Sequence, residues 1–224
     1  MHNVTNAYAI SEIWFSNSDP SQNFVVVNVL EGIGTGIFAN GQILRGGNGI
    51  AGEFRHVQVS PGGLPCSCGG CGCWETLASN RAALHYYDEL APRRSGTTFD
   101  LLIKLGLSGD PLATEALTRV FVELGRGIRM IAPALDPDEI IEVGDITSAW
   151  SIFAPTIVNE MRGNSMLTGP VLRPSHNGDD ARLRSAVALI LNERLLEVVR
   201  FLLWEERRSG PPHTGRRMID TAYA

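Results

Sequence analysis

The sequence lacks the features that mark membrane, secreted and nucleic-acid-binding proteins. Its most apolar helical segment, 185–204, is interrupted by four charged residues, so we expect no membrane-spanning helix and no membrane partner. The first fifteen residues contain no cationic segment followed by an apolar run, which favours a cytoplasmic protein over a secreted one. A formal net charge of −5 provides no basic field for phosphate backbones. We therefore expect DNA contacts only through a domain absent from this chain.

Cysteine is absent everywhere except in one short segment, which holds all four: Cys66, Cys68, Cys71 and Cys73. Such crowding is too tight for an ordinary disulfide framework and suits a metal in a reducing compartment. Glycines between the cysteines let the backbone turn, so that several thiolates and the preceding His56 converge on one point. Structural zinc takes four N or S ligands, and spacing alone does not say which of the five candidates is spare. A metal-free loop and a disulfide such as Cys66 to Cys71 remain alternatives.

Apolar patterns over the rest of the chain alternate between strand and helix spacing, which predicts an α/β domain. Residues 4–15 are predicted as an amphipathic helix and 24–30 as a buried strand. A hairpin follows, with a type I′ turn at Asn40-Gly41. Further strands are predicted at 56–59, 139–143 and 167–172, and further helices from about 74 and at 81–90, 99–105, 111–135, 149–162 and 180–206. We interpret 1–206 as one lobe and 207–224 as a flexible C-terminal tail.

The stretch from Gly52-Glu53-Phe-Arg-His56 through C-x-C-G-x-x-G-C-x-E resembles the signature of the ROK family of sugar kinases and sugar-responsive transcriptional regulators. Residues 3–12 are similar to the family's N-D-A-N helix, 32–41 to its G-x-G-x-G hairpin and 135–144 to a later strand. The resemblance covers roughly residues 3 to 190. It implies an actin-like ATPase, ribonuclease H-like lobe with an inserted zinc loop at 56–75.

The same resemblance implies residue roles around this loop. The structural zinc ligands would be His56, Cys66, Cys68 and Cys73, which leaves Cys71 as the extra cysteine. Hexose hydroxyls would be hydrogen-bonded by Glu53, His56, Glu75 and Asn3. The simpler alternatives are a solvated loop carboxylate for Glu53 and, for Glu75, a residue favoured by the dipole at a helix start.

Three positions depart from the pattern that the resemblance implies for a kinase. Val4 occupies the position of the catalytic Asp and cannot accept a proton. Leu30-Glu31 replaces the Gly-Thr before the phosphate hairpin, and Val143-Gly144 replaces the Gly-Gly that admits adenine. The hairpin glycines are then simply those of a tight turn. We therefore expect no catalytic residue, and neither ATP nor Mg²⁺ as a cofactor.

The resulting prediction is the sugar-sensing effector lobe of a ROK-type transcriptional regulator, such as a repressor, that binds zinc and a hexose as a homodimer. An ATP-dependent hexose kinase and a truncated remnant without function are the alternatives. The family's first lobe and winged helix-turn-helix are missing from this chain, which fits a shortened version of a longer protein, a truncated gene or a misplaced start.

Overall fold

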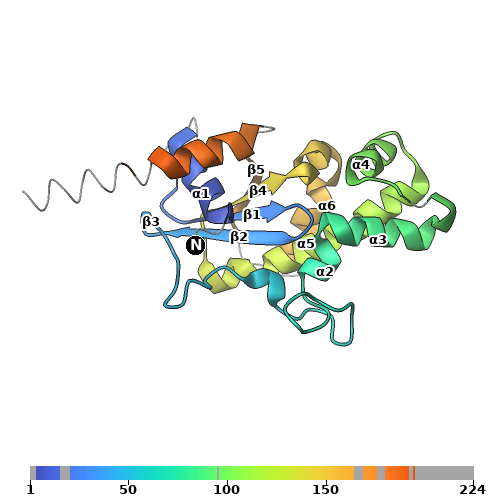
Figure 1. The fold of residues 1–224 in the computed structure, drawn as a ribbon, viewed down its shortest axis with the longest axis horizontal. Coiled ribbons are helices and arrows are strands. Elements are labelled where there is room, and N and C mark those ends of the chain that lie inside the picture. The colour runs from blue at the N-terminus through green and yellow to red at the C-terminus, as the bar shows by residue number, and fades with distance from the viewer. Residues whose placement is uncertain are drawn as a thin grey trace, which may run out of the picture. The chain divides into compact units, whose positions relative to one another are not determined.

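The computed structural model describes residues 4–15, 21–94, 96–163, 169–175, 180–191 and 194. A five-stranded mixed sheet in the order β3-β2-β1-β4-β5 forms its centre (Figure 1). The strands are β1 (Phe24–Val29), β2 (Ile33–Ala39), β3 (Gln42–Ile43), β4 (Glu139–Gly144) and β5 (Val171–Pro174). β1 pairs antiparallel with β2 and parallel with β4, and β4 pairs parallel with β5. The fold is that of the compact unit Met1–Leu189.

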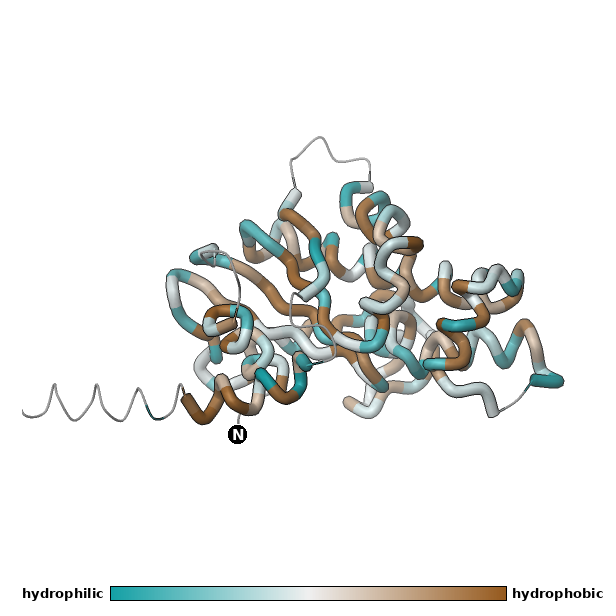
Figure 2. The backbone as a smooth tube through the Cα atoms, turned by 90° about the horizontal axis from the view of Figure 1, so that it is seen from above, coloured by the Kyte–Doolittle hydropathy of each residue, from teal (hydrophilic) through white to brown (hydrophobic). Residues whose placement is uncertain are grey.

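β1 lies at the middle of the sheet because its side chains are apolar on both faces. All six of its residues are buried, as expected for a valine-rich strand between two layers. Figure 2 shows hydrophobic stretches following the central strands. The turn between β2 and β3 has positive φ at both Asn40 (52°) and Gly41 (78°), which confirms the predicted hairpin.

Helices cover both faces of the sheet. They are α1 (Val4–Phe15), α2 (Glu75–Ala78), α3 (Asn80–Leu90), α4 (Phe99–Leu107), α5 (Pro111–Leu135) and α6 (Trp150–Arg162), and residues 181–191 are also helical. Three short 3₁₀ helices span Phe54–His56, Pro92–Arg94 and Asp145–Ala149. Side chains of α5 and α6 pack on the face that carries Val27 and Ile140, whereas Tyr8 of α1 packs on the face that carries Val26 and Ile141. None of the described helices is long and apolar enough to cross a bilayer.

α5 is the longest described helix, and its ends follow local signals in the sequence. Asp110 caps its start by accepting hydrogen bonds from the backbone N–H groups of Leu112 (3.1 Å) and Ala113 (3.0 Å). Pro111 occupies the first turn, where no intrahelical partner for its nitrogen is needed. The helix ends where Asp136 adopts a left-handed conformation with φ of 44°. The predicted bounds of 111–135 are confirmed.

Three predictions of local structure are wrong or shifted. The predicted strand at 56–59 is instead a 3₁₀ helix at Phe54–His56 followed by an isolated bridge between Gln58 and Cys73. α1 is buried from Thr5 to Glu12 on all sides rather than along one amphipathic face. The strand predicted at 167–172 is β5, which begins at Val171. Residues 164–168, all of the predicted helix beyond 191 except residue 194, and the tail 207–224 lie outside the described residues.

Candidate metal centre and adjoining pockets

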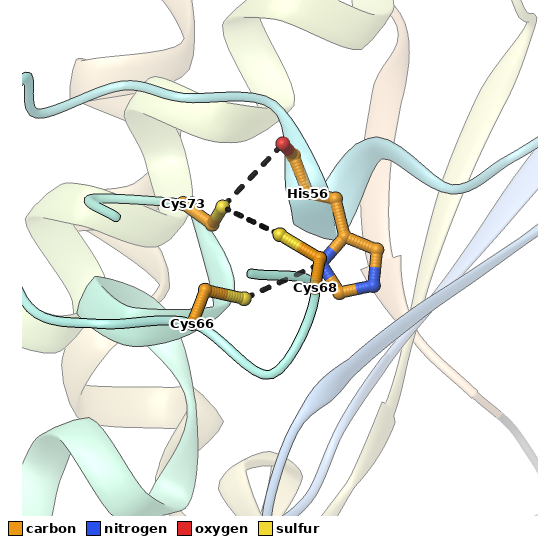
Figure 3. Close-up of side chains that lie close together, drawn as sticks. All are labelled: His56, Cys66, Cys68 and Cys73. Carbon is orange, nitrogen blue, oxygen red and sulfur yellow. Dashed lines mark hydrogen bonds between the residues drawn. The ribbon is translucent and has the colours of Figure 1, made fainter. Parts of the chain in front are cut away.

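Four side chains from one short segment of the chain, residues 56–73, converge beside the helix α2. The ligand atoms of His56, Cys66, Cys68 and Cys73 all lie within 4.8 Å of one another. Figure 3 shows the four side chains pointing toward a common centre. The four residues predicted as metal ligands are therefore brought together, and Cys71 does not belong to the group.

A tight, glycine-containing loop produces this convergence. His56 ends the 3₁₀ helix, and its backbone N–H donates to the Glu53 carbonyl at 3.1 Å. Cys66 N–H donates to the Gly70 carbonyl at 2.9 Å, which folds the segment between them back on itself. Gly72 has φ of 64°, and a Cβ there would overlap the Ser60 carbonyl. Glycine is therefore required where the chain returns toward Cys73.

The loop is fixed to the core by the residue that follows its last cysteine. Trp74 is fully buried, and its Nε1–H donates to the Glu123 carbonyl of α5 at 2.9 Å. The indole lies against Gly127, where a Cβ would overlap the ring. Trp74 N–H also donates to the Val57 carbonyl at 3.0 Å. Cys73 is thus held between α5 and the segment that carries His56.

The donor set and its spacing fit a zinc ion. Cys66 Sγ lies 3.4 Å from His56 Nδ1, and Cys68 Sγ lies 3.6 Å from Cys73 Sγ. A tetrahedron with zinc–sulfur bonds of about 2.3 Å and zinc–nitrogen bonds of about 2.0–2.1 Å has edges of roughly 3.5–3.8 Å. The separations of 3.4 Å and 3.6 Å are close to these edges. Three thiols and one imidazole also form one of the usual ligand sets of structural zinc.

The thiols of this cluster differ in acidity when no metal is bound. Burial raises the pKa of Cys73 to about 12. The exposed Cys68 thiol instead has its pKa lowered, first by the Gly70 backbone N–H and then by the Cys73 thiol. Metal binding requires thiolates, so loading the site would release protons, and the Cys73 proton would be the hardest of them to remove.

Two of the three described residues predicted to contact sugar adjoin each other. His56 Nε2, the ring nitrogen that points away from the cysteines, lies 3.9 Å from Glu53 Oε2. Arg55 Nε lies 2.8 Å from the same oxygen. Glu75 points instead to the β1–β2 hairpin, where Glu75 Oε2 accepts a hydrogen bond from Ile33 N–H at 3.2 Å. The predicted sugar contact Asn3 lies outside the described residues.

A pocket of about 270 Å³ opens between the zinc loop, the hairpin and α3. Glu75 and Cys66 line it together with Glu31, and Arg81 and His85 of α3 add one guanidinium and one imidazole. The sequence analysis did not single out Arg81 and His85. Their spacing of four residues within the helix predicted at 81–90 is the signal that places both on one face.

A second pocket, of about 460 Å³, lies at the carboxyl ends of β1 and β4. Leu30 and Val143 both line it, so two of the positions that depart from the kinase pattern meet in one place. Asp145 adds a carboxylate, whose Oδ2 accepts a hydrogen bond from Asn80 Nδ2 at 3.1 Å. Val4, the third departure, has 63% of its surface exposed at the start of α1.

Comparison with known proteins identifies relatives of two functional kinds. A family profile described as "ROK family" matches residues 1–193. Over 157 residues the chain is 34% identical to the DNA-binding transcriptional dual regulator NagC of Escherichia coli K12, covering 66% of this chain and 38% of the regulator. It thus spans well under half of that relative.

Solved structures share the fold. A ROK family glucokinase from Streptomyces griseus, solved with glucose and AMPPNP, superposes with a TM-score of 0.77 at 25% identity, covering 84% of this chain and 67% of the glucokinase. A ROK family transcriptional regulator homologous to the Escherichia coli MLC protein superposes with a TM-score of 0.73 at 27% identity, covering 88% and 53%. These likenesses and the mixed sheet confirm the predicted actin-like, ribonuclease H-like α/β fold.

Proposed function

The chain belongs to the ROK family, and we propose that it is the effector lobe of a transcriptional regulator that holds zinc and binds a hexose without phosphorylating it. The observation that carries this proposal is the orientation of the His56 ring. Its Nδ1 faces Cys66 Sγ at 3.4 Å, while its Nε2 faces Glu53 Oε2 at 3.9 Å. One ring nitrogen is therefore directed to the metal cluster and the other to a carboxylate.

A zinc ion bound by His56, Cys66, Cys68 and Cys73 would fix the imidazole in one tautomer. Coordination through Nδ1 leaves the proton on Nε2, which then acts as a hydrogen-bond donor. The Glu53 carboxylate beside it acts only as an acceptor. Neighbouring hydroxyls of a sugar each offer a donor and an acceptor, so a fixed donor beside a fixed acceptor suits them. Glu75, on the other side of the loop, would supply a further acceptor.

The second pocket supports binding without phosphoryl transfer. A kinase of this family would bind ATP and Mg²⁺ there, yet Leu30 and Val143 place side chains where the kinase pattern has glycines. The pocket is lined by one acidic and one basic side chain, Asp145 and Arg182, so the shape of the pocket, and not its charge, disfavours phosphoryl transfer. The side chains of Leu30 and Val143 do not fit a nucleotide held as the family pattern requires.

In this proposal hexose binding changes how two paired subunits present their DNA-binding domains, and those domains determine the operator sequence.

Calorimetric titration of the zinc-loaded chain with N-acetylglucosamine, glucose and xylose tests the proposal. These sugars represent the chemical types expected from the family. We expect one of them to bind, and Glu53→Gln to weaken binding about tenfold or more, because a hydrogen bond to a charged group contributes about 1.5–3 kcal/mol. Glu115→Gln, which changes an exposed carboxylate on α5, is the matched control and should bind like the unmodified chain.

The same samples distinguish the kinase alternative. A coupled assay for ADP release with ATP, Mg²⁺ and each sugar should give no signal above that of the chain without sugar. Sugar-dependent ADP release would establish a kinase and overturn the proposed regulator. A zinc-loaded chain that binds none of the sugars would contradict the sugar-binding half of the proposal.

A further inference from the structure

The fifth soft side chain of the zinc loop, Cys71, is left without a role by the four-ligand cluster. It stands three residues after Cys68 in the sequence Cys68-Gly69-Gly70-Cys71, which is the C-x-x-C spacing of redox-active dithiols. The same two residues are the most accessible of the four cysteines. Cys68 is exposed and Cys71 is partly exposed, whereas Cys66 and Cys73 are buried.

The surroundings hold the Cys71 backbone and leave its thiol available. Gln58 Nε2 donates to the Cys71 carbonyl at 2.9 Å, and a bridge joins Cys71 to Pro65. The Cys71 Sγ itself has one polar contact, with Gln58 Nε2 at 3.7 Å. If zinc takes His56 and the other three cysteines, Cys71 is the thiol that no metal occupies.

The backbone at Gly69 allows the two sulfurs to approach. A Cβ at Gly70 would make only ordinary van der Waals contacts, at 3.5 Å from Cys68 Sγ and 4.0 Å from Cys73 Sγ. Gly69 has φ of 91° with no atom within 4 Å of its would-be Cβ. The segment therefore combines a backbone that only glycine readily adopts with open space, which permits Cys68 to turn from the cluster toward Cys71.

We propose that Cys68 and Cys71 form a peroxide-sensitive dithiol, whose oxidation to a disulfide removes one ligand from the zinc centre and releases the metal. The Cys68 thiolate attacks hydrogen peroxide: a sulfur–oxygen bond forms, the oxygen–oxygen bond breaks, and the departing hydroxide takes a proton to become water. The Cys71 thiolate then attacks the sulfur of this sulfenic acid, so that the disulfide forms and a second water leaves. Overall the zinc-bound Cys68 thiolate and the Cys71 thiol lose two electrons, and one peroxide becomes two waters with the Cys71 proton and one proton from solvent.

Loss of Cys68 leaves three ligands at a centre whose geometry needs four. His56, which would be held by the same metal, then loses its fixed orientation beside Glu53. Oxidant would in this way switch off sugar binding. Zinc release by the dithiol rests on the metal half of the proposed function, and only its consequence for sugar binding rests on the sugar half.

The test starts from the zinc-loaded full chain and exposes it to a small molar excess of hydrogen peroxide. A chromogenic chelator records zinc release, and tandem mass spectrometry reads the tryptic peptide 56–81, which carries all four cysteines between Arg55 and Arg81. We expect zinc release in step with a Cys68–Cys71 disulfide, and recovery of both thiols and zinc after treatment with dithiothreitol and added zinc.

Cys71→Ser is the variant that decides the assignment. It should bind zinc like the unmodified chain, form no disulfide at Cys68 under peroxide, and instead accumulate a sulfenic acid there that dimedone traps. Zinc release from this variant at the unmodified rate, with Cys68 joined to Cys73, would overturn the inference. So would zinc that stays bound to the unmodified chain through oxidation. A chain that holds no zinc before oxidation would instead overturn the metal half of the proposed function, and the inference with it.

Discussion

At the scale of single residues, Glu142 is the side chain that fits its surroundings least. It lies in the middle of β4 beside Val27 of β1, and none of its surface is exposed. Alternation along the strand places it on the same apolar face as Ile140. Neither carboxyl oxygen has a hydrogen-bond partner among the described residues. Burial therefore raises the pKa of Glu142 well above its ordinary range.

This raised pKa makes the stability of the fold depend on pH in a defined direction. The folded protein binds the Glu142 proton more tightly than the unfolded chain, whose carboxyl titrates at about pH 4.3. The protonated Glu142 carboxyl thus makes its full contribution to the free energy of unfolding below that pH. This contribution is lost as the pH rises through the raised pKa of the folded protein. Glu142→Leu removes both the titrating carboxyl and its two unpartnered oxygens. The substitution should therefore stabilise the fold by about 1–3 kcal/mol near neutral pH.

Urea unfolding of both proteins at pH 5 and pH 8 measures this effect. The gain from Glu142→Leu should be larger at pH 8 than at pH 5. Glu139→Leu in the same strand is the comparison, because Glu139 is paired with Arg173 at 2.9 Å and should lose stability at both pH values. A gain that does not grow with pH would show that Glu142 is not an uncharged buried carboxyl in the native protein.

At the scale of elements, the contact between α5 and the zinc loop depends on the absence of a side chain at Gly127. A Cβ there would overlap the Trp74 indole, and the ring cannot move away because it is buried and hydrogen-bonded to α5. Gly127→Ala should therefore destabilise the fold by about 1–3 kcal/mol, despite the helix propensity that alanine adds. Displacement of Trp74 also moves Cys73, so zinc affinity should fall in the same variant.

Gly106→Ala in α4 provides the matched comparison. Its Cβ would meet the end of the flexible Leu117 side chain rather than a fixed ring. The gain in helix propensity, about 1 kcal/mol, should offset much of that crowding. Urea unfolding followed by circular dichroism, with zinc titration of each folded variant, compares the two. If Gly127→Ala and Gly106→Ala change zinc affinity equally, then the packing of Trp74 against α5 does not fix the position of Cys73.

The elements that sequence patterns predicted well are those whose ends depend on neighbours in the chain. α5 begins at an Asp cap followed by Pro111, and the Asn40-Gly41 turn contains its own conformational signal. The segment around His56 was predicted wrongly because its shape depends on distant partners, such as the Val59 N–H that donates to the Gly72 carbonyl at 2.9 Å. Periodicity likewise could not show that α1 is covered on all sides.

The candidate site, like the fold, was predicted only in part. Spacing alone offered five soft ligands, and the family resemblance named the four that the structure brings together. That these four hold zinc stays a prediction, as do the sugar contacts of Glu53, His56 and Glu75. The burial of Glu142 was not predictable, because it depends on how separate elements pack. The spacing of Arg81 and His85 indicates a shared helix face, but not the pocket that they line.

At the scale of the whole molecule, the zinc loop joins parts of the fold that are far apart in sequence. The Gly52 carbonyl just before it accepts a hydrogen bond from Thr35 of β2, Trp74 N–H donates to the Val57 carbonyl, and the Trp74 indole is bonded to α5. A metal that binds only the folded loop must therefore stabilise the whole cooperative unit. At free zinc one hundred times its dissociation constant the expected gain is about 2.7 kcal/mol.

Chelation should reverse that gain, and the unfolding temperature should fall by roughly 2–4 °C for each kcal/mol lost. Each tenfold rise in buffered free zinc should restore about 1.4 kcal/mol. Because the buried Cys73 must lose its proton to bind, the zinc-dependent part of the stability should increase as the pH is raised from 6 to 8. His56→Ala should abolish the dependence on zinc and Cys71→Ser should preserve it. Two results would contradict this prediction: an unfolding temperature of the unmodified chain that does not change with free zinc, or a Cys71→Ser variant whose unfolding temperature no longer depends on zinc. Either result would mean that the four clustered side chains are not the ligands through which zinc stabilises the fold.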